Sequence, residues 1–163
     1  MARKVFYSFH YKLDNARAAQ VRNMGVVEGN PPASDNDWES IERGGDPAIK
    51  RWIDGQLSGK SCAVVLIGSQ TAGRKWINYE IETAWKEGKG LLGIYINNLK
   101  DLDSKQVFKG QNPFEAFKIG TQNMASIVKV YDPPGQDSNL VYAYIKNNFS
   151  NWIEEAIAIR QRY

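Results

Sequence analysis

Glu80 is the residue whose type and position most favour chemistry. It lies one helical turn after Trp76 and about one before Thr83, on the flank of an apolar stripe with helical spacing. This position is near the start of the predicted helix, beside the carboxyl end of the preceding strand. Open α/β sheets bind ligands at those strand ends, so the Glu80 carboxylate can face a ligand. From spacing alone, a glutamate at such a position is more often a solvated helix residue.

A strand, a helix and a second strand position Glu80. Residues 62–67, CAVVLI, form a continuous apolar run that is typical of a strand buried on both faces. Residues 75–87 carry apolar side chains at i, i+4, i+7 and i+8, which predicts an amphipathic helix that Gly88 and Gly90 end. Residues 91–96 form another apolar run, so the segment predicts a βαβ unit of a parallel sheet.

The chain before this unit predicts a strand, a helix and a loop. Residues 4–9, KVFYSF, alternate as a strand does. Asp14 can cap a helix with a thin apolar face that runs to about Met24 and is closed by Gly25. Residues 26–37 are rich in Gly, Pro, Asn and Asp, which predicts a weak second strand and an exposed loop.

A further helix leads into the central strand, and an irregular segment follows the βαβ unit. Asp46 and Pro47 provide the cap and first-turn signal of a helix that ends at Gly59. Residues 98–124 have no clear periodicity and predict a long surface insertion. Residues 125–131, ASIVKVY, predict the last strand.

Two helices are predicted at the end of the chain. Residues 139–146 favour a short helix, and Asn151 with Glu154 resembles a capping pair that opens a second one. Strands that alternate with helices predict one domain over residues 1–163, an α/β three-layer sandwich with a parallel sheet of about five strands. In a flavodoxin-like strand order, the ligand crevice lies between strands one and three, at residues 10–14 and 69–74.

Composition limits the class of protein. The chain of 163 residues has a net charge of +3 and no dense basic block, so nucleic acid is not an expected partner. Cys62 is the single cysteine, which excludes an internal disulfide and favours a reducing compartment. No apolar run is long enough for a signal peptide or a membrane span, so we expect a cytoplasmic protein.

Several common sites lack their sequence signals. The first strand is followed by HYKLDN rather than a glycine-rich phosphate loop, which argues against Rossmann and Walker sites. Gly68 and Ser69 end the middle strand, where a phospho-receiver needs an aspartate. One histidine and one cysteine make a zinc site of the usual ligand set improbable, and we expect no metal.

Four stretches carry a resemblance to a known family. KVFYSFHYK near the start, CAVVLIGSQTAGRKWINYEIETAWKEGKGLLGIYIN in the middle, and the later NPF and WIEEA resemble the TIR-like domains, once classed as a domain of unknown function. The match is closest to the TIR-like subunit of the bacterial antiphage system Thoeris. It extends over nearly the whole chain and is most specific from Val64 to Asn97.

The resemblance implies an enzyme that consumes NAD+. Such TIR domains cleave the bond between nicotinamide and ribose, and Thoeris members release a cyclic or otherwise modified ADP-ribose. This diffusible second messenger activates a partner effector, with a phage component as the trigger. The family places a tryptophan shortly before a catalytic glutamate, and Trp76 and Glu80 stand there with three residues between them, where many TIR enzymes have two.

One carboxylate suffices for this chemistry. Glycosidases usually need a second carboxylic acid for a poor leaving group, but nicotinamide leaves as a neutral base. Glu80 can stabilise the oxocarbenium-like transition state, and exclusion of water favours cyclisation over hydrolysis. Trp76 or a tyrosine can stack on the pyridinium ring, and Arg74 or Arg17 can meet the diphosphate. The residues expected to contact NAD+ are Ser8, Phe9, His10, Tyr11, Arg17, Trp38, Ser69, Arg74, Trp76 and Asn78.

Each assignment has a structural alternative. Trp76 can be a core anchor, His10 a satisfied structural group, and Ser8 and Ser69 can bond backbone at strand ends. Two other classes of function also stay open. One is a non-catalytic TIR-like module that binds a nucleotide or a protein. The other is an adaptor that forms homo-oligomers through the loop at about residues 29–38.

Overall fold

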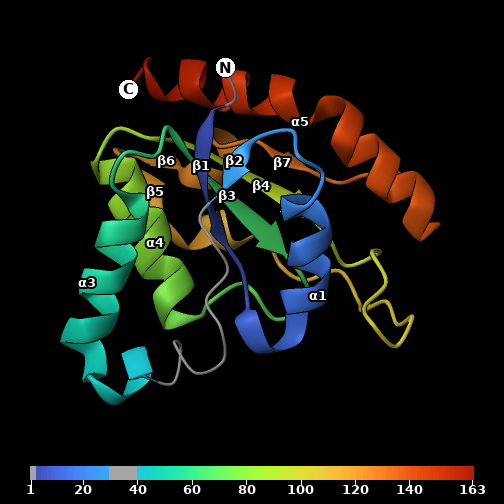
Figure 1. The fold of residues 1–163 in the computed structure, drawn as a ribbon. Coiled ribbons are helices and arrows are strands. Elements are labelled where there is room, and N and C mark those ends of the chain that lie inside the picture. Colours follow the sequence, from blue (N-terminus) through green and yellow to red (C-terminus); the bar gives the residue numbers. More distant parts are fainter. Residues whose placement is uncertain (1–2, 30–39) are drawn as a thin grey trace.

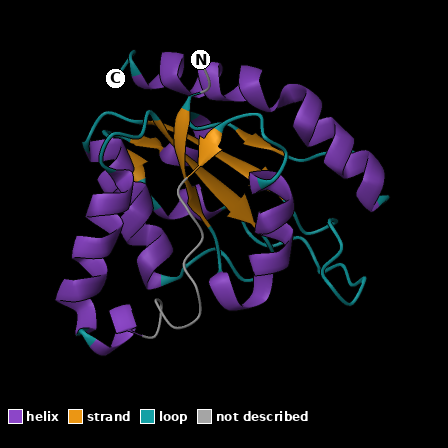
Figure 2. Cartoon of the chain, viewed as in Figure 1, coloured by secondary structure: helices purple, strands orange, loops and turns teal. Residues whose placement is uncertain are grey.

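A parallel sheet with strand order β2-β1-β3-β4-β7 forms the centre of the computed structural model, which describes residues 3–29 and 40–163 (Figures 1 and 2). Every neighbouring pair in this sheet is parallel. The order confirms the predicted flavodoxin-like winding. The strands are β1 Lys4–Ser8, β2 Glu28–Gly29, β3 Cys62–Ile67, β4 Gly90–Tyr95 and β7 Val130–Tyr131.

Helices cover both faces of the sheet, as the three-layer prediction requires. Helices α3 and α4 lie together on one face, on the left of Figure 1, and α1 and α5 pack on the other. Parallel strands need such crossover helices, so both faces become buried. The helices are α1 Tyr11–Arg22, α3 Gly45–Leu57, α4 Lys75–Lys86 and α5 Ser138–Arg160.

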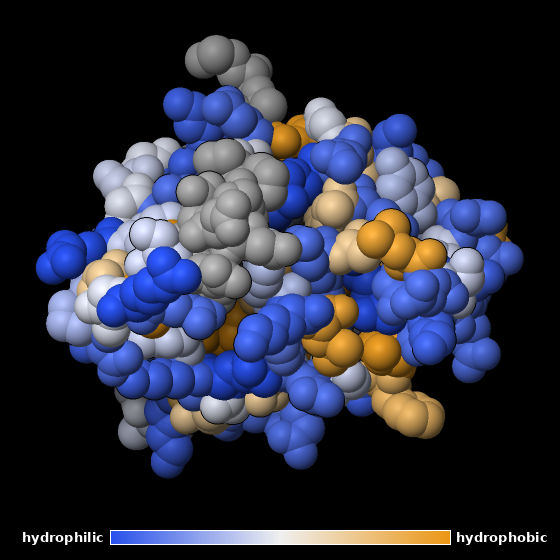
Figure 3. All heavy atoms as spheres, turned by 60° about the horizontal axis from the view of Figure 1, so that its bottom comes forward, coloured by the Kyte–Doolittle hydropathy of each residue, from blue (hydrophilic) through white to orange (hydrophobic). Residues whose placement is uncertain are grey.

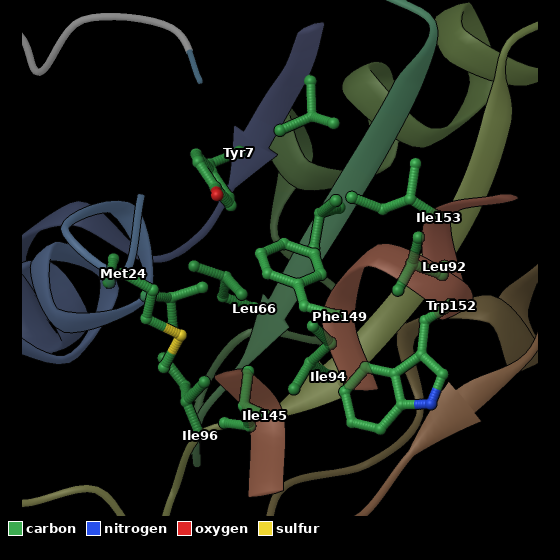
Figure 4. Close-up of a cluster of buried hydrophobic side chains, with 14 of the residues drawn as sticks. Tyr7, Met24, Leu66, Leu92, Ile94, Ile96, Ile145, Phe149, Trp152 and Ile153 are labelled. Carbon is green, nitrogen blue, oxygen red and sulfur yellow. The ribbon is translucent and has the colours of Figure 1, made fainter. Parts of the chain in front are cut away.

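Strands β3 and β4 form the rigid middle of the fold. Every residue of both strands is buried, and their pairing runs from Cys62 opposite Gly90 to Ile67 opposite Tyr95. Alternate side chains enter two separate cores, one on each face. Figure 4 shows the core under α5, where Leu66, Leu92 and Ile94 meet Phe149 and Trp152. Because this centre is fully packed, the strand ends provide a fixed frame for a site.

Two aspartates expected to cap helices lie inside the first turn instead. Helix α1 begins at Tyr11 with His10 as its N-cap residue, and the backbone N–H of Asp14 donates to the His10 carbonyl at 2.8 Å. Helix α3 begins at Gly45, so Asp46 is its second residue and forms an ion pair with Lys75. The capping prediction was wrong for both residues. The Asp46 carboxylate pairs with Lys75 at the start of α4, and the Asp14 carboxylate pairs with Arg17 further along α1.

The chain end forms one helix rather than two. Helix α5 runs without a break from its cap at Asp137, whose carboxylate accepts from the N–H groups of Asn139 and Leu140. Asn151 lies in its interior and is exposed, so the predicted capping pair there was wrong. The buried residues recur at helical spacing through the whole helix, and this apolar stripe keeps it continuous. They are Val141, Ile145, Phe149, Trp152, Ile153, Ala156 and Ile159.

The last strand is shorter than predicted. Residues 124–126 form a 3₁₀ turn, η2, and the strand β7 begins only at Val130. The side chain of Asn123 caps this turn by accepting from the N–H of Ala125 at 2.8 Å. This local bond competes with strand pairing, so only two residues of the predicted strand join the sheet edge.

The segment 98–124 is not only a surface insertion. Leu99 and Phe114 are fully buried, and Phe114 lies in the 3₁₀ turn η1, Pro113–Ala116. A small antiparallel hairpin follows, in which β5 Lys118–Ile119 pairs with β6 Gln122–Asn123. Leu99 and Phe114 are single apolar residues outside any periodic segment, so the sequence pattern did not predict that they are buried.

The surface at the carboxyl ends of the strands is mainly hydrophilic, with separate hydrophobic patches (Figure 3). In the part of the chain that the structure describes, no helix combines the length and the apolar character that crossing a membrane requires.

Candidate functional site

The carboxyl ends of β1 and β3 meet where the strand order reverses. Ser8 is the last residue of β1 and pairs with Val65 of β3. Side chains alternate along a strand, and Phe6 faces the core under α3 and α4, so Ser8 points to the same side. Glu80 comes to this point from the first half of α4. The predicted switch-point crevice therefore joins a hydroxyl and a carboxyl from distant parts of the chain.

The Glu80 side chain is buried without a balancing charge. Only 9% of its surface is exposed, and its Oε2 atom has no hydrogen-bond partner among the described residues. Burial raises the pKa of this carboxyl to about 8. The nearby Ser8 hydroxyl acts in the opposite direction and lowers the pKa. A polar group in this state is costly for a fold and marks a candidate functional site.

Ser8 is equally unusual. Its side chain is 1% exposed, and its Oγ atom has no partner within hydrogen-bond distance among the described residues. The hydroxyl is nevertheless close enough to the Glu80 carboxyl to lower its pKa. The alternative that Ser8 simply bonds the backbone at a strand end is not what this geometry shows.

His10 and Arg74 lie at the mouth of the same crevice. His10 is the N-cap residue of α1 and is 9% exposed. Burial lowers the pKa of its imidazole, and the positive charge of Arg74 lowers it further. Arg74 is the N-cap residue of α4 and is exposed, so its guanidinium is available to an anion. A neutral imidazole beside a free guanidinium suits a phosphate-bearing ligand.

Trp76 forms part of the wall between α3 and α4. It is partly buried and packs against the core on that face. The Lys75 ammonium lies 4.9 Å from the centre of its indole ring, and the ring of Tyr79 meets it edge-on with centroids 5.8 Å apart. The Tyr79 hydroxyl donates to Asp54 of α3 at 2.8 Å, which holds this wall in place. Trp76 is therefore both a packing residue and a neighbour of Glu80 on the same helix flank.

Phe9 and Tyr11 lie on the other side of the sheet. Phe9 packs against the core beneath α1 and α5, and its ring stacks with that of Tyr11 at a centroid distance of 6.4 Å. The guanidinium of Arg22 lies 5.8 Å from the centre of the Phe9 ring. The packing of Phe9 under α1 and α5 and the stacking of Tyr11 on it therefore separate both rings from the side on which Glu80 lies.

Arg17 is a structural residue in this fold. Its side chain is fully buried and donates to the Leu99 carbonyl at 2.9 Å, the Lys105 carbonyl at 2.8 Å and the Asp14 carboxylate at 3.1 Å. These bonds tie α1 to the segment that follows β4. The guanidinium has no surface for a diphosphate, so we do not retain Arg17 in the proposed site.

The backbone after β3 is packed on two sides. A Cβ atom on Gly68 would lie 2.2 Å from Oδ2 of Asp14, and one on Gly110 would lie 2.3 Å from the Gly68 carbonyl oxygen. The Gly68 N–H donates to Thr71 Oγ1 at 2.8 Å, which closes the turn that carries the half-buried Ser69. The sequence placed Asp14 and Thr71 in the two crevice loops but did not predict that both are fully buried, because neither has a local pattern that signals burial.

The last two candidates do not join Glu80. Asn78 lies about 160° from Glu80 around the helix axis, since successive residues are roughly 100° apart. Its Oδ1 atom is buried without a partner among the described residues, on the opposite flank of α4. Trp38 and most of the loop 29–38, the proposed assembly surface, lie outside the described residues.

The assembled groups limit the chemistry. Within residues 3–29 and 40–163, no cluster of three His, Cys, Asp or Glu side chains could hold a metal ion. Cys62 is buried at the start of β3, and burial raises the pKa of its thiol, so it is not an activated nucleophile. The crevice offers one carboxyl, one hydroxyl, an imidazole and an aromatic wall. Such a set can stabilise a cationic centre without a general acid.

Comparisons with known proteins place these residues within a known domain family. A family described as "Thoeris protein ThsB, TIR-like domain" matches residues 6–101, which include Ser8, His10, Trp76 and Glu80. The chain is 41% identical over 120 residues to a Bacillus cereus (strain MSX-D12) protein named "Putative cyclic ADP-D-ribose synthase ThsB1". The aligned part covers 71% of this chain and 62% of that relative, so it spans less than two thirds of the relative's length.

Proposed function

Since the chain belongs to the TIR-like domain family of the Thoeris protein ThsB, we propose that it cleaves the nicotinamide–ribose bond of NAD+ and cyclises the ADP-ribose part. The name of the Bacillus cereus relative supports a cyclic ADP-ribose product. The observation that carries the proposal is the buried, uncompensated Glu80 carboxyl at the carboxyl ends of β1 and β3.

Glu80 acts on the sugar rather than on the leaving group. When the bond between ribose C1′ and the ring nitrogen breaks, both electrons go to nitrogen and nicotinamide leaves neutral. The positive charge then develops on the ribose C1′ and ring oxygen. A carboxylate beside this centre stabilises the charge, and in a site shielded from water the interaction is stronger than in bulk solvent. Ser8 supports the carboxylate as a hydrogen-bond donor.

The residues around Glu80 bind and orient the two ends of the substrate. Trp76 offers an aromatic face for the pyridinium ring, an attraction of about 0.5 to 2 kcal/mol. Arg74 and the neutral His10 lie at the crevice mouth, where the diphosphate can meet a charge and a ring N–H. Ser69 lies on the turn after β3 and can bond a ribose hydroxyl.

Water access decides the product. Attack on C1′ by an adenine or ribose atom of the same molecule, with loss of its proton, closes a ring, whereas attack by water gives open ADP-ribose. The segment around Gly110 packs directly on the backbone after β3, and Tyr95 holds it by donating to the Gly110 carbonyl at 3.1 Å. This cover reduces the exposure of the crevice and favours the internal nucleophile.

The product would serve as a second messenger in antiphage defence. A cyclic or modified ADP-ribose is small and charged, and it would diffuse in the cytoplasm to an effector that binds it. A phage component would trigger the enzyme. These roles follow from family membership.

The test is mass spectrometry of NAD+ incubated with the purified protein, with and without lysate from phage-infected cells. Glu80→Gln is the key variant, and Glu82→Gln, an exposed carboxylate two residues away, is its matched control. We expect nicotinamide and a product lighter than ADP-ribose by one water from the wild type and from Glu82→Gln only.

Other outcomes would change the assignment. Turnover that survives in Glu80→Gln would remove Glu80 from the catalytic role. Open ADP-ribose as the main product would make the protein a hydrolase. No turnover under any condition, with NAD+ still bound, would favour the non-catalytic nucleotide-binding module.

A further inference from the structure

Two buried polar atoms from different elements lie together in the crevice without partners. Ser8 Oγ belongs to the end of β1, and Glu80 Oε2 to α4. Both side chains are more than nine-tenths buried. Native folds satisfy almost all such groups, so an exception at a strand-end crevice indicates a group that a ligand completes.

The charged side chains described on α1, α3 and α4 leave Glu80 without a compensating charge. Lys75 pairs with Asp46, the Asp54 carboxylate accepts from Tyr79, and Lys50 lies 5.7 Å from the centre of the Tyr79 ring. Arg74 and Lys12 act on His10. Two causes shift the pKa of Glu80, burial and the Ser8 hydroxyl, and neither is a charge.

We propose that the free protein holds Glu80 as a neutral carboxylic acid, and that a ligand with a cationic ring binds with release of the Glu80 proton. An uncompensated carboxylate is disfavoured in this buried position. A pyridinium ring supplies the missing positive charge, so the ionised carboxyl and the cation stabilise each other. The proton leaves to solvent, and no other group changes charge.

Proton release gives the site a means to select the oxidised dinucleotide. NAD+ carries a ring cation, whereas NADH has the same shape with a neutral ring. Only the ring cation offsets the free-energy cost of ionising the buried Glu80 carboxyl. NADH would therefore bind to the neutral acid and release no proton. Affinity for the cation depends on pH, since protons compete with it for the same carboxyl. The inference rests on the proposed function only for its choice of ligand.

Isothermal titration calorimetry with carba-NAD+ tests this coupling without turnover. Carba-NAD+ keeps the ring cation but has no cleavable glycosidic bond. Titrations at pH 7 in phosphate and in Tris, which differ in ionisation enthalpy, give the number of protons released. With a pKa of about 8 in the free protein, we expect nearly one proton per ligand. Kd should fall about tenfold between pH 6 and 7, about fivefold between pH 7 and 8, and then level off.

Matched measurements separate the proposal from its rivals. NADH should bind without proton release, and Glu80→Gln should bind carba-NAD+ more weakly, with a Kd that no longer follows pH. Carba-NAD+ that binds the wild type with no proton release, or fails to bind a folded protein, would overturn the inference. Cleavage of NAD+ is measured separately, so a coupled but inactive protein would refute the enzymatic function and leave this inference standing.

Discussion

The Ser8 hydroxyl and the Glu80 carboxyl lie close together at the carboxyl end of β1, 72 positions apart in the sequence and both without a hydrogen-bond partner among the described residues. The hydroxyl lowers the pKa of the carboxyl against the effect of burial.

Ser8→Ala is predicted to move the pH dependence of activity. Loss of the hydroxyl raises the pKa of Glu80 further, so less carboxylate is present at neutral pH. The hydroxyl donates to the carboxylate once Glu80 is ionised, and one hydrogen bond contributes about 1 kcal/mol, which predicts a 3- to 10-fold loss of kcat/KM at pH 7 and recovery at higher pH. Steady-state kinetics from pH 6 to 9 measure this. Ser61→Ala, at the other end of β3, is the control, and an unmoved profile in Ser8→Ala would contradict the prediction.

Glu80→Gln is predicted to stabilise the fold at alkaline pH. The folded-state pKa of about 8 lies above the usual 4.5, so the folded protein binds more protons than the unfolded chain between these values. Stability therefore falls as pH rises from about 4.5 to 8. The neutral amide avoids this loss, which amounts to about 3 to 5 kcal/mol at pH 8.

Urea unfolding at pH 5 and pH 8 checks that effect. Wild type and Glu80→Gln should differ little at pH 5 and clearly at pH 8. Glu82→Gln should follow the wild type at both, because Glu82 is exposed. A Glu80→Gln protein no more stable than wild type at pH 8 would show that the carboxyl already has a compensating partner.

Gly68→Ala is predicted to destabilise the protein. The new Cβ would lie 2.2 Å from Oδ2 of Asp14, and Arg17 fixes that carboxylate. Overpacking of this kind costs about 1 to 3 kcal/mol. Gly55→Ala, in α3 with open space around it, is the matched control and should stabilise by roughly 0.5 to 1 kcal/mol. Thermal unfolding of both variants tests this prediction. Equal melting temperatures would show that a Cβ atom at Gly68 does not clash with Asp14.

Arg17→Met is predicted to lower stability rather than substrate affinity. It leaves Asp14 buried without its partner, and burial already raises the pKa of that carboxyl. Breaking such a pair costs about 3 to 5 kcal/mol. The exposed pair of Arg3 and Glu154 serves as control, and Arg3→Met should change stability little. A stable Arg17→Met protein with a raised KM would restore the diphosphate role.

Arg74→Met is predicted to show the opposite behaviour. Its side chain is exposed at the start of α4, so its loss should leave the melting temperature nearly unchanged. If the guanidinium meets the diphosphate, KM for NAD+ should rise by about tenfold while kcat changes less. Loss of its charge should also raise the pKa of His10, which NMR titration can follow.

Local sequence patterns were enough to predict the central strands and the helix that carries Glu80. The runs CAVVLI and LLGIYI and the stripe of Ile77, Ile81 and Ala84 predicted β3, β4 and α4 within one residue, because periodicity and burial coincide in a parallel sheet. Glu80 stood out from its place on that helix. The family resemblance gave it a role.

The residues that accompany Glu80 became known only from the packing of the folded chain. The fold brings Ser8 close to the Glu80 carboxyl and buries Arg17, which donates to the Leu99 carbonyl. It places Phe9 and Tyr11 on the face of the sheet opposite Glu80. It also showed α5 as one helix and Phe114 as a core residue. These features depend on contacts between residues far apart in the chain. A local sequence pattern indicates whether a side chain can be buried. Only tertiary packing determines which residues that side chain contacts, and these contacts set its hydrogen-bond partners and its pKa.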